Sequence, residues 1–519
     1  TTPTAAAVTE NAVYRTLYAS EVTTLNYLIT GQTNELNIAA NVVDCLVEYD
    51  SYGNVEPALA TSWEQNEDAT VWTFHIREGV KWVDVNGNEK ADCTAHDFAS
   101  GMEWILNFYK NDSANTSMPL EMLEGANEYY EYTKTLSEEE ALALTAEEGS
   151  PFSEMVGVEV PDDYTIIYTC VTEKPYFDTL CVYQSLYPIS PAMVEELGGP
   201  DGVRSMNNEN MWYNGCYTIT HYINGNEKVL TKNPLYWDTD CTLFDTVTYK
   251  MVESGDVAFQ MFQAGELDYI ELTESNLRTI YNSESNEFHD YIVEARPTKY
   301  SYQLHLCWDK RDENGDPDVN WNTAIANENF RLAWYYGLDA TAYLARTNFI
   351  YPQHCANYCY TMSNLVSFSD GTDYTDRVME KLGISPDGEN YARVDAAKAA
   401  EYKAKAMEEL TAKGVTFPVV VDYYIQGSSQ TALDTANVLK QMFSDCLGDD
   451  FVTLNIKTYI SSVNKEVRNP QLQSFVINGW GADYGDPVNF VGQEILHDDN
   501  AYYSWYYSNI AKIVEAGPA

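Results

Sequence analysis

The stretch Phe475 to Phe490, FVINGWGADYGDPVNF, sets the frame for interpreting the rest of the chain. Its first three residues are aromatic and β-branched, which predicts a short strand buried on both faces, and Gly479 is expected to end that strand. The two later glycines permit torsions closed to other residues, and an Asp-Pro step fixes the exit. The sequence therefore predicts a constrained loop at a strand end, which carries Trp480, Asp483 and Tyr484.

This loop has two interpretations when its residues are taken alone. Glycine, aspartate and proline after a strand also form plain turns, and a tryptophan there also packs in cores. An indole held beside a carboxylate, in contrast, would bind an amine on an apolar body. The pattern GW-x-ADY-x-DP after an apolar strand resembles a motif of the family 5 solute-binding proteins of ABC importers, the dipeptide and oligopeptide receptors. The resemblance implies that Asp483 pairs with the α-amino group of a peptide and that Trp480 lines the same cleft.

Other motifs resemble passages of this family and occur in the family's order. They are VVDCLVEYDSYGNVEPALATSWE from Val42 to Glu64, the strand and turn from Val71 to Trp82, the helix that Thr94 and Asp97 are expected to cap, NGCY and KNPLYW from Asn214 to Trp237, and AGELD ending at Asp268. The resemblance covers nearly all of Val13 to Phe490. Family members usually continue with a helix, a closing strand and a return to the first lobe, so we expect a missing tail or a first lobe completed differently.

The resemblance implies an α/β, periplasmic-binding-protein-like fold of the cluster C type, with two main lobes around a cleft and an extra subdomain. Residues 1–48 and 157–268 are assigned to lobe I, with 492–519 as a candidate third piece. Residues 49–156 form the extra subdomain and 269–491 form lobe II. A helix from Asp395, then a strand, a helix and a strand up to Tyr459, indicate a βαβ-like series in lobe II.

Composition excludes several classes of partner. Lys plus Arg is 30 against 79 for Asp plus Glu, a net charge of −49, so nucleic acid and anionic membrane surfaces would be repelled. No apolar run approaches the roughly 20 residues of a membrane span. The Thr- and Ala-rich start, Thr1 to Thr9, is typical of a linker and would suit a lipoprotein. The family resemblance implies an extracellular protein, either anchored as a lipoprotein on a Gram-positive surface or periplasmic.

The reactive residues indicate no catalytic or metal site. The ten cysteines form no CxxC pair, which argues against structural zinc and leaves their disulfide state open. The seven histidines lie far apart, and no GxSxG, HExxH or P-loop spacing occurs. We therefore expect a binding protein, not an enzyme, with no cofactor and no metal.

The functional hypothesis is a monomeric two-lobed trap that closes on a peptide and presents it to the transmembrane subunits of an ABC permease. Backbone groups near the strand end would pair with the peptide main chain, as in strand addition. The candidate substrate-binding residues are Asp483, Trp480, Gly481, Ala482, Tyr484, Gly31, Gln32, Thr33, Asn34, Tyr300 and Tyr302. Two alternatives stay open, namely an oligosaccharide receptor of the same fold, favoured by 11 Trp and 41 Tyr, and a surface adhesin or sensor.

Overall fold

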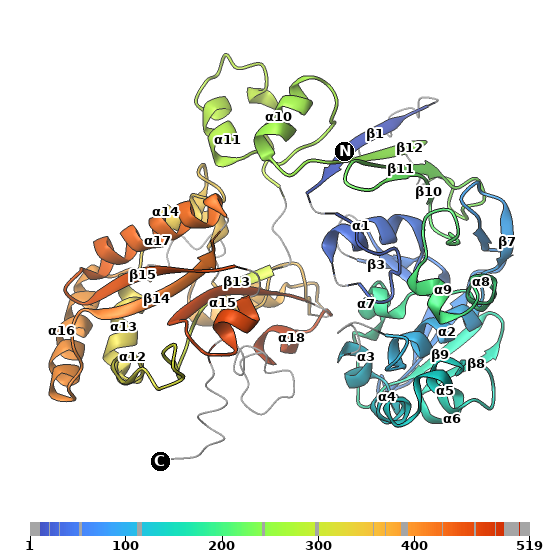
Figure 1. Ribbon diagram of the computed structural model, residues 1–519, viewed down its shortest axis with the longest axis horizontal. Helices are drawn as coiled ribbons and strands as arrows, with labels where there is room; N and C mark the ends of the chain where they lie inside the picture. The colour runs from blue at the N-terminus through green and yellow to red at the C-terminus, as the bar shows by residue number, and fades with distance from the viewer. Residues whose placement is uncertain are drawn as a thin grey trace. The chain divides into compact units, whose positions relative to one another are not determined.

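The chain folds into two compact units, Thr1–Asn276 and Leu277–Ala519, in the computed structural model (Figure 1). The structure describes residues 11–19, 21–30, 32–50, 54–111, 117–240, 244–295, 300–356, 358–368, 370–385, 393–427, 429–460, 463–482, 484–492 and 508. Both units mix helices and sheets, as the expected α/β class requires. The predicted division into lobe I, an extra subdomain and lobe II, with a boundary after Asp268, stays a prediction.

The first unit contains two four-stranded sheets. In one, β1 runs parallel to β12, and β12, β11 and β10 are antiparallel neighbours. In the other, β4, β5, β9 and β8 are antiparallel in that order. The bounds are β1 (Val13–Tyr18), β10 (Tyr217–Ile223), β11 (Glu227–Lys232), β12 (Thr246–Met251), β4 (Ala60–Gln65), β5 (Val71–Ile76), β8 (Val158–Asp162) and β9 (Thr165–Thr169), with the short pairs β2 (Val47–Tyr49) and β3 (Val55–Pro57), and β6 (Lys81–Val83) and β7 (Glu89–Asp92).

Helices surround these sheets, and capping boxes begin two of them, of which the one at Thr94 is predicted from the sequence. The Thr94 N–H donates to Asp97 Oδ2 over 2.6 Å at the start of α2, and the Ser137 N–H donates to Glu140 Oε2 over 3.0 Å at the start of α5. The helices are α1 (Thr33–Val42), α2 (Ala95–Leu106), α3 (Ser117–Met122), α4 (Ala126–Thr135), α5 (Glu138–Leu142), α6 (Pro151–Met155), α7 (Phe177–Leu180), α8 (Pro191–Glu196), α9 (Pro200–Arg204) and α10 (Gly255–Gln263), and α11 (Glu274–Tyr281) crosses the boundary.

A buried ion pair joins the helical part of the first unit. Lys110 Nζ lies 2.6 Å from Glu103 Oε2, and both side chains are buried. Tyr129 Oη and Asn107 Nδ2 each donate to Glu103 Oε1 over 2.9 Å, so the carboxylate has a partner on both oxygens. This network is fully satisfied and links α2 with α4.

Among the described residues, the second unit has the strands β13, β14, β15 and β16, with helices packed on them (Figure 1). β13 (Tyr300–Leu306) pairs antiparallel with β16 (Phe475–Gly481), and β14 (Val419–Gln426) pairs parallel with β15 (Val452–Tyr459). The helices are α12 (Val319–Ile325), α13 (Glu328–Gly337), α14 (Thr341–Leu344), α15 (Tyr374–Leu382), α16 (Ala396–Ala412), α17 (Gln430–Leu447) and α18 (Val488–Val491).

An aromatic core holds this second unit together. The centroid of the Phe443 ring in α17 lies 4.9 Å from that of Trp334 in α13 and 5.6 Å from that of Phe475 in β16. The order β14, α17, β15 confirms the predicted βαβ series, and Asp395 caps α16 as expected, by accepting the Ala397 N–H over 3.1 Å.

One element differs from the prediction: β16 does not end at Gly479 but continues to Gly481. Gly479 pairs with Tyr302 and Gly481 pairs with Tyr300 across the ladder. A Cβ on Gly479 would lie 2.9 Å from Tyr302 Cδ1, and a Cβ on Gly481 would lie 2.5 Å from Tyr300 Cε1. These glycines therefore admit the tyrosine rings of the neighbouring strand, and Trp480 lies inside a strand instead of on a loop.

No described helix is long and apolar enough to cross a bilayer. The nine described cysteines form no disulfide with one another, and Cys241 lies outside the described residues.

Candidate functional site

The end of the β13–β16 pair presents an exposed aromatic face. Strand alternation places Tyr300 and Tyr302 on the same face as Leu304, which packs against the aromatic core further along. The two phenol rings have centroids 6.3 Å apart, and the residues are 41% and 59% exposed. The face thus passes from buried core to an exposed tyrosine pair.

Trp480 lies on the other face of the same strands. It pairs with Ser301, and its Nε1–H donates to Asn489 Oδ1 of α18 over 2.8 Å. Because Asn489 is buried, this bond ties the strand to the helix that follows the turn. The structure therefore does not bring Trp480 and the tyrosine pair to one surface. Sequence reasoning missed Asn489, since nothing in the order of residues connects it with an indole nine positions earlier.

Two hydrogen bonds lie within residues 484–488, which follow β16. Ala482 is buried and Tyr484 is half-buried. The Asp486 N–H donates to the Tyr484 carbonyl over 3.0 Å, and the Val488 N–H donates to Asp486 Oδ1 over 2.8 Å, which leads the chain into α18. Asp483, the expected ammonium partner, lies outside the described residues. Its role stays a prediction.

The second candidate loop belongs to the first unit, at the start of α1. Gln32 and Thr33 are exposed, and the Gln32 carbonyl accepts the Glu35 N–H over 3.0 Å. Asn34 Nδ2 donates to the Glu21 carbonyl over 2.8 Å, which holds the helix start against the preceding segment. Gly31 lies outside the described residues. The candidate residues thus form two groups, one in each unit.

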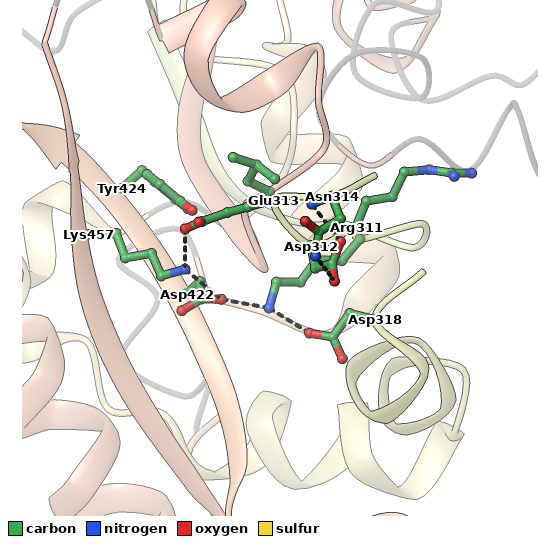
Figure 2. A pocket seen from close by; sticks show the side chains of 10 residues that line it. Arg311, Asp312, Glu313, Asn314, Asp318, Asp422, Tyr424 and Lys457 are labelled. Atoms are coloured by element: carbon green, nitrogen blue, oxygen red, sulfur yellow. Dashed lines mark hydrogen bonds and ion pairs between the residues drawn. The ribbon is translucent and has the colours of Figure 1, made fainter. Parts of the chain in front are cut away.

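A cavity of about 290 Å³ in the second unit, which no sequence pattern singled out, is bordered by alternating charges (Figure 2). Lys310 Nζ lies 2.8 Å from Asp318 Oδ2 and 2.7 Å from Asp422 Oδ2. Lys457 Nζ continues the chain at 3.9 Å from Asp422 and 3.8 Å from Glu313. Each of these four groups lies next to a group of opposite charge. The ion pairs therefore link the loop before α12 to the strands β14 and β15.

Burial affects the pKa of Lys310 in this cavity and the pKa of His305 in β13. Burial alone would lower the pKa of Lys310, but its hydrogen bonds to Asp318 and Asp422 outweigh burial, and the pKa is raised. Burial lowers the pKa of His305 in β13 to about 4, although its bond to the Asn478 carbonyl opposes the change. His305 is therefore neutral at pH 7. Among the described residues, no group of three or more His, Cys, Asp or Glu side chains is arranged to hold a metal ion.

Comparison with known proteins links these features to a family. The model of the bacterial extracellular solute-binding proteins, family 5 Middle, matches residues 54–501. The oligopeptide-binding protein AmiA of Streptococcus pneumoniae is 27% identical over 509 residues, which cover 92% of this chain and 73% of that protein. The matched residues include both described units.

Solved structures share the fold. The substrate-binding domain of an oligopeptide ABC transporter from Bacillus anthracis superposes with a TM-score of 0.66 at 20% identity, over 98% of this chain and 87% of that one. Listeria monocytogenes OppA bound to peptide gives a TM-score of 0.66 at 17% identity, over 98% and 88%. The expected periplasmic-binding-protein-like α/β fold is thereby confirmed.

Proposed function

This chain belongs to the bacterial extracellular solute-binding proteins of family 5, and we propose that it captures oligopeptides outside the cell and delivers them to the permease of an ABC importer. Its relative AmiA is named as an oligopeptide-binding protein, and the Listeria structure of the same fold holds a peptide. Capture would proceed without chemical conversion, by a monomer that is lipid-anchored at a Gram-positive surface or periplasmic.

The observation that carries this proposal is the exposed tyrosine pair next to the ordered turn. Tyr300 and Tyr302 present flat rings where β16 ends, and the turn that follows carries Asp483. A carboxylate that meets a peptide ammonium makes a charge-assisted bond, while aromatic rings accept side chains of varied shape. Recognition of this kind fixes the ligand by its amino terminus and leaves side chains loosely selected.

The first experiment is native mass spectrometry of the purified protein, followed by thermal shift against a library of random pentapeptides. Co-purified peptides, or a raised melting temperature that is lost when the same peptides are N-acetylated, support capture through the ammonium group. Peptides recovered with unchanged mass after incubation support binding without catalysis. A shift with oligosaccharides alone would replace the peptide proposal with the sugar receptor.

Asp483→Ala is the matched test of the ammonium partner. A buried ammonium left without its carboxylate weakens binding by roughly 2 to 5 kcal/mol. Asp486→Asn is the control: it removes a negative charge from the same turn but keeps an oxygen that can accept the Val488 N–H. We expect Asp483→Ala to lose affinity and Asp486→Asn to retain it. Equal affinity of Asp483→Ala and wild type would refute the assignment.

A further inference from the structure

Lys228 of β11 is a fully enclosed cation in the first unit. Its side chain is 0% exposed, and Nζ lies 2.6 Å from both Glu21 Oε1 and Tyr18 Oη. The ammonium lies 4.1 Å from the ring centroid of Tyr18 and 4.5 Å from that of Tyr222. Two aromatic faces, a phenol oxygen and a carboxylate therefore surround one positive charge.

A buried lysine needs a reason beyond core packing. Removing an ammonium from water is unfavourable unless it is paired, and an apolar side chain of similar volume often stabilises a protein as well or better. The best-attested use of such a pair is to select one geometry among several. The groups that the Lys228 pair holds in place are therefore the place to look for its role.

Those groups belong to the chain that leads to the loop at the start of α1. Glu21 accepts the Val22 N–H over 2.7 Å through the same oxygen that faces Lys228, and its other oxygen accepts the Gly225 N–H. Tyr222 Oη donates to the Val22 carbonyl over 3.0 Å, and Asn34 donates to the Glu21 carbonyl. The carboxylate of Glu21 thus joins the β10–β11 hairpin to the segment that Asn34 grips.

A second carboxylate, which is buried, fixes the other end of the same segment. Glu35 of α1 accepts the Thr23 N–H over 2.6 Å and the Thr23 hydroxyl over 2.7 Å. The Thr24 N–H donates to the same oxygen over 3.3 Å, and the Thr30 hydroxyl donates to the other. Residues 21–30 are thereby held at their start by Glu21 and further along by Glu35. Lys228 forms the ion pair with Glu21.

We propose that Lys228 is a positioning residue for solute capture: through Glu21 it holds the loop that presents Gln32, Thr33 and Asn34. The inference rests on the proposed function, because only a protein that captures a solute with this loop needs the loop preformed. A loop that is already ordered does not lose conformational freedom when ligand binds, so the ligand binds more tightly. Lys228 itself touches no ligand.

Lys228→Met and Lys110→Met are the matched variants that test this role. Each replaces a buried lysine paired with a carboxylate, and Met fills a similar volume, but only Lys228 adjoins the loop. Dissociation constants are measured by calorimetry with the library peptide that wild type retains most tightly, well below both unfolding midpoints. We expect both variants to melt earlier, Lys228→Met to bind at least about tenfold more weakly, and Lys110→Met to bind like wild type.

Hydrogen exchange supplies a readout that a purely structural role would not move. We expect amides of residues 21–36 to exchange faster in Lys228→Met and to stay unchanged in Lys110→Met. Tyr222→Phe removes only the bond to the Val22 carbonyl, leaves a ring over the ammonium, and gives a milder test if Lys228→Met does not fold. It should weaken binding in the same direction.

The outcomes separate the two proposals. A wild-type protein that binds no library peptide contradicts the proposed function. A wild-type protein that binds, together with Lys228→Met binding as tightly and exchanging as slowly, overturns the positioning role alone. Equal loss of affinity in Lys228→Met and Lys110→Met would also overturn it, because the effect would then follow general stability.

Discussion

Replacing each of the two glycines of β16 by alanine should have different consequences, because different atoms stand in the way. A Cβ on Gly481 would lie 2.5 Å and 2.8 Å from two ring atoms of Tyr300, and the exposed ring is able to swing aside. A Cβ on Gly479 would lie 2.8 Å from the Ser301 carbonyl oxygen, which is part of the ladder. We expect Gly479→Ala to disturb the strand pair and Gly481→Ala to disturb only the tyrosine.

The magnitudes follow from these contacts. Overpacking against fixed atoms typically costs 1 to 3 kcal/mol, so Gly479→Ala should lower the free energy of unfolding by about that amount. For Gly481→Ala, the cost of moving an exposed ring is offset by the 0.4 to 1 kcal/mol, roughly, that Gly→Ala contributes by restricting the unfolded chain. Its stability should stay within about 1 kcal/mol of wild type. Loss of the Tyr300 contact, worth about 0.5 to 1.5 kcal/mol, should weaken peptide binding by roughly two- to tenfold.

Urea unfolding and calorimetric titration with a retained peptide measure the two effects separately. Gly481→Ala should combine near-normal stability with weakened binding, whereas Gly479→Ala should lose stability first. Two equally destabilised variants would show that the tyrosine ring is as immobile as the backbone. A normal affinity for Gly481→Ala would remove Tyr300 from the candidate site.

Three further predictions concern buried charges. Burial raises the pKa of Asp44 and of Asp97 to about 7, so these carboxyls favour the folded state below pH 4 and lose that contribution as pH rises through 7. In urea unfolding at pH 8, Asp44→Asn should therefore have a higher free energy of unfolding than wild type, by about 1 to 3 kcal/mol. Equal or lower stability would show that the ionised carboxylate is well accommodated. His305 has the opposite pH dependence: because its pKa in the folded state is about 4, the protein loses stability as pH falls below 6.5. An NMR titration should find its imidazole still neutral at pH 5. Lys310→Met should lower the free energy of unfolding in urea by about 3 kcal/mol, because buried Asp422 would lose the ammonium at 2.7 Å and keep the Asn455 amide at 2.8 Å and Lys457 at 3.9 Å. An unchanged midpoint would mean that water replaces the ammonium.

Much of the fold is local in origin and could be predicted. Thr94 and Asp395 precede periodic apolar runs and cap helices, and the strands β14 and β15 carry the β-branched residues that buried parallel strands require. The end of β16 could not be predicted, because Gly479 reads as a strand breaker until the neighbouring strand is known to lay Tyr302 over it.

In the candidate site, too, some features follow from local sequence and others depend on tertiary contacts. Strand alternation is enough to place Tyr300 and Tyr302 on one face, but exposure depends on where the core stops. The bond from Trp480 to Asn489 and the pairing of Lys228 with Glu21 depend on side chains that only the folded chain brings together. Local patterns indicate which residues can touch a solute, whereas the residues that hold them in place are set by tertiary contacts.

In both groups of candidate residues, buried hydrogen bonds lie behind exposed side chains, and this arrangement affects selectivity. Behind the first, Glu35 is saturated by hydroxyl and amide donors, and behind the second the indole of Trp480 is bonded to Asn489. The side chains of Gln32, Thr33 and Tyr302 in front of these anchors are exposed and can adapt to different ligands. A peptide receptor of broad selectivity needs this separation, since its fixed contacts must recognise the main chain and terminus common to all peptides while the others adjust. Loosening the buried anchors should therefore weaken all peptides by a similar factor, whereas changes at Tyr300 or Tyr302 should reorder preferences among them.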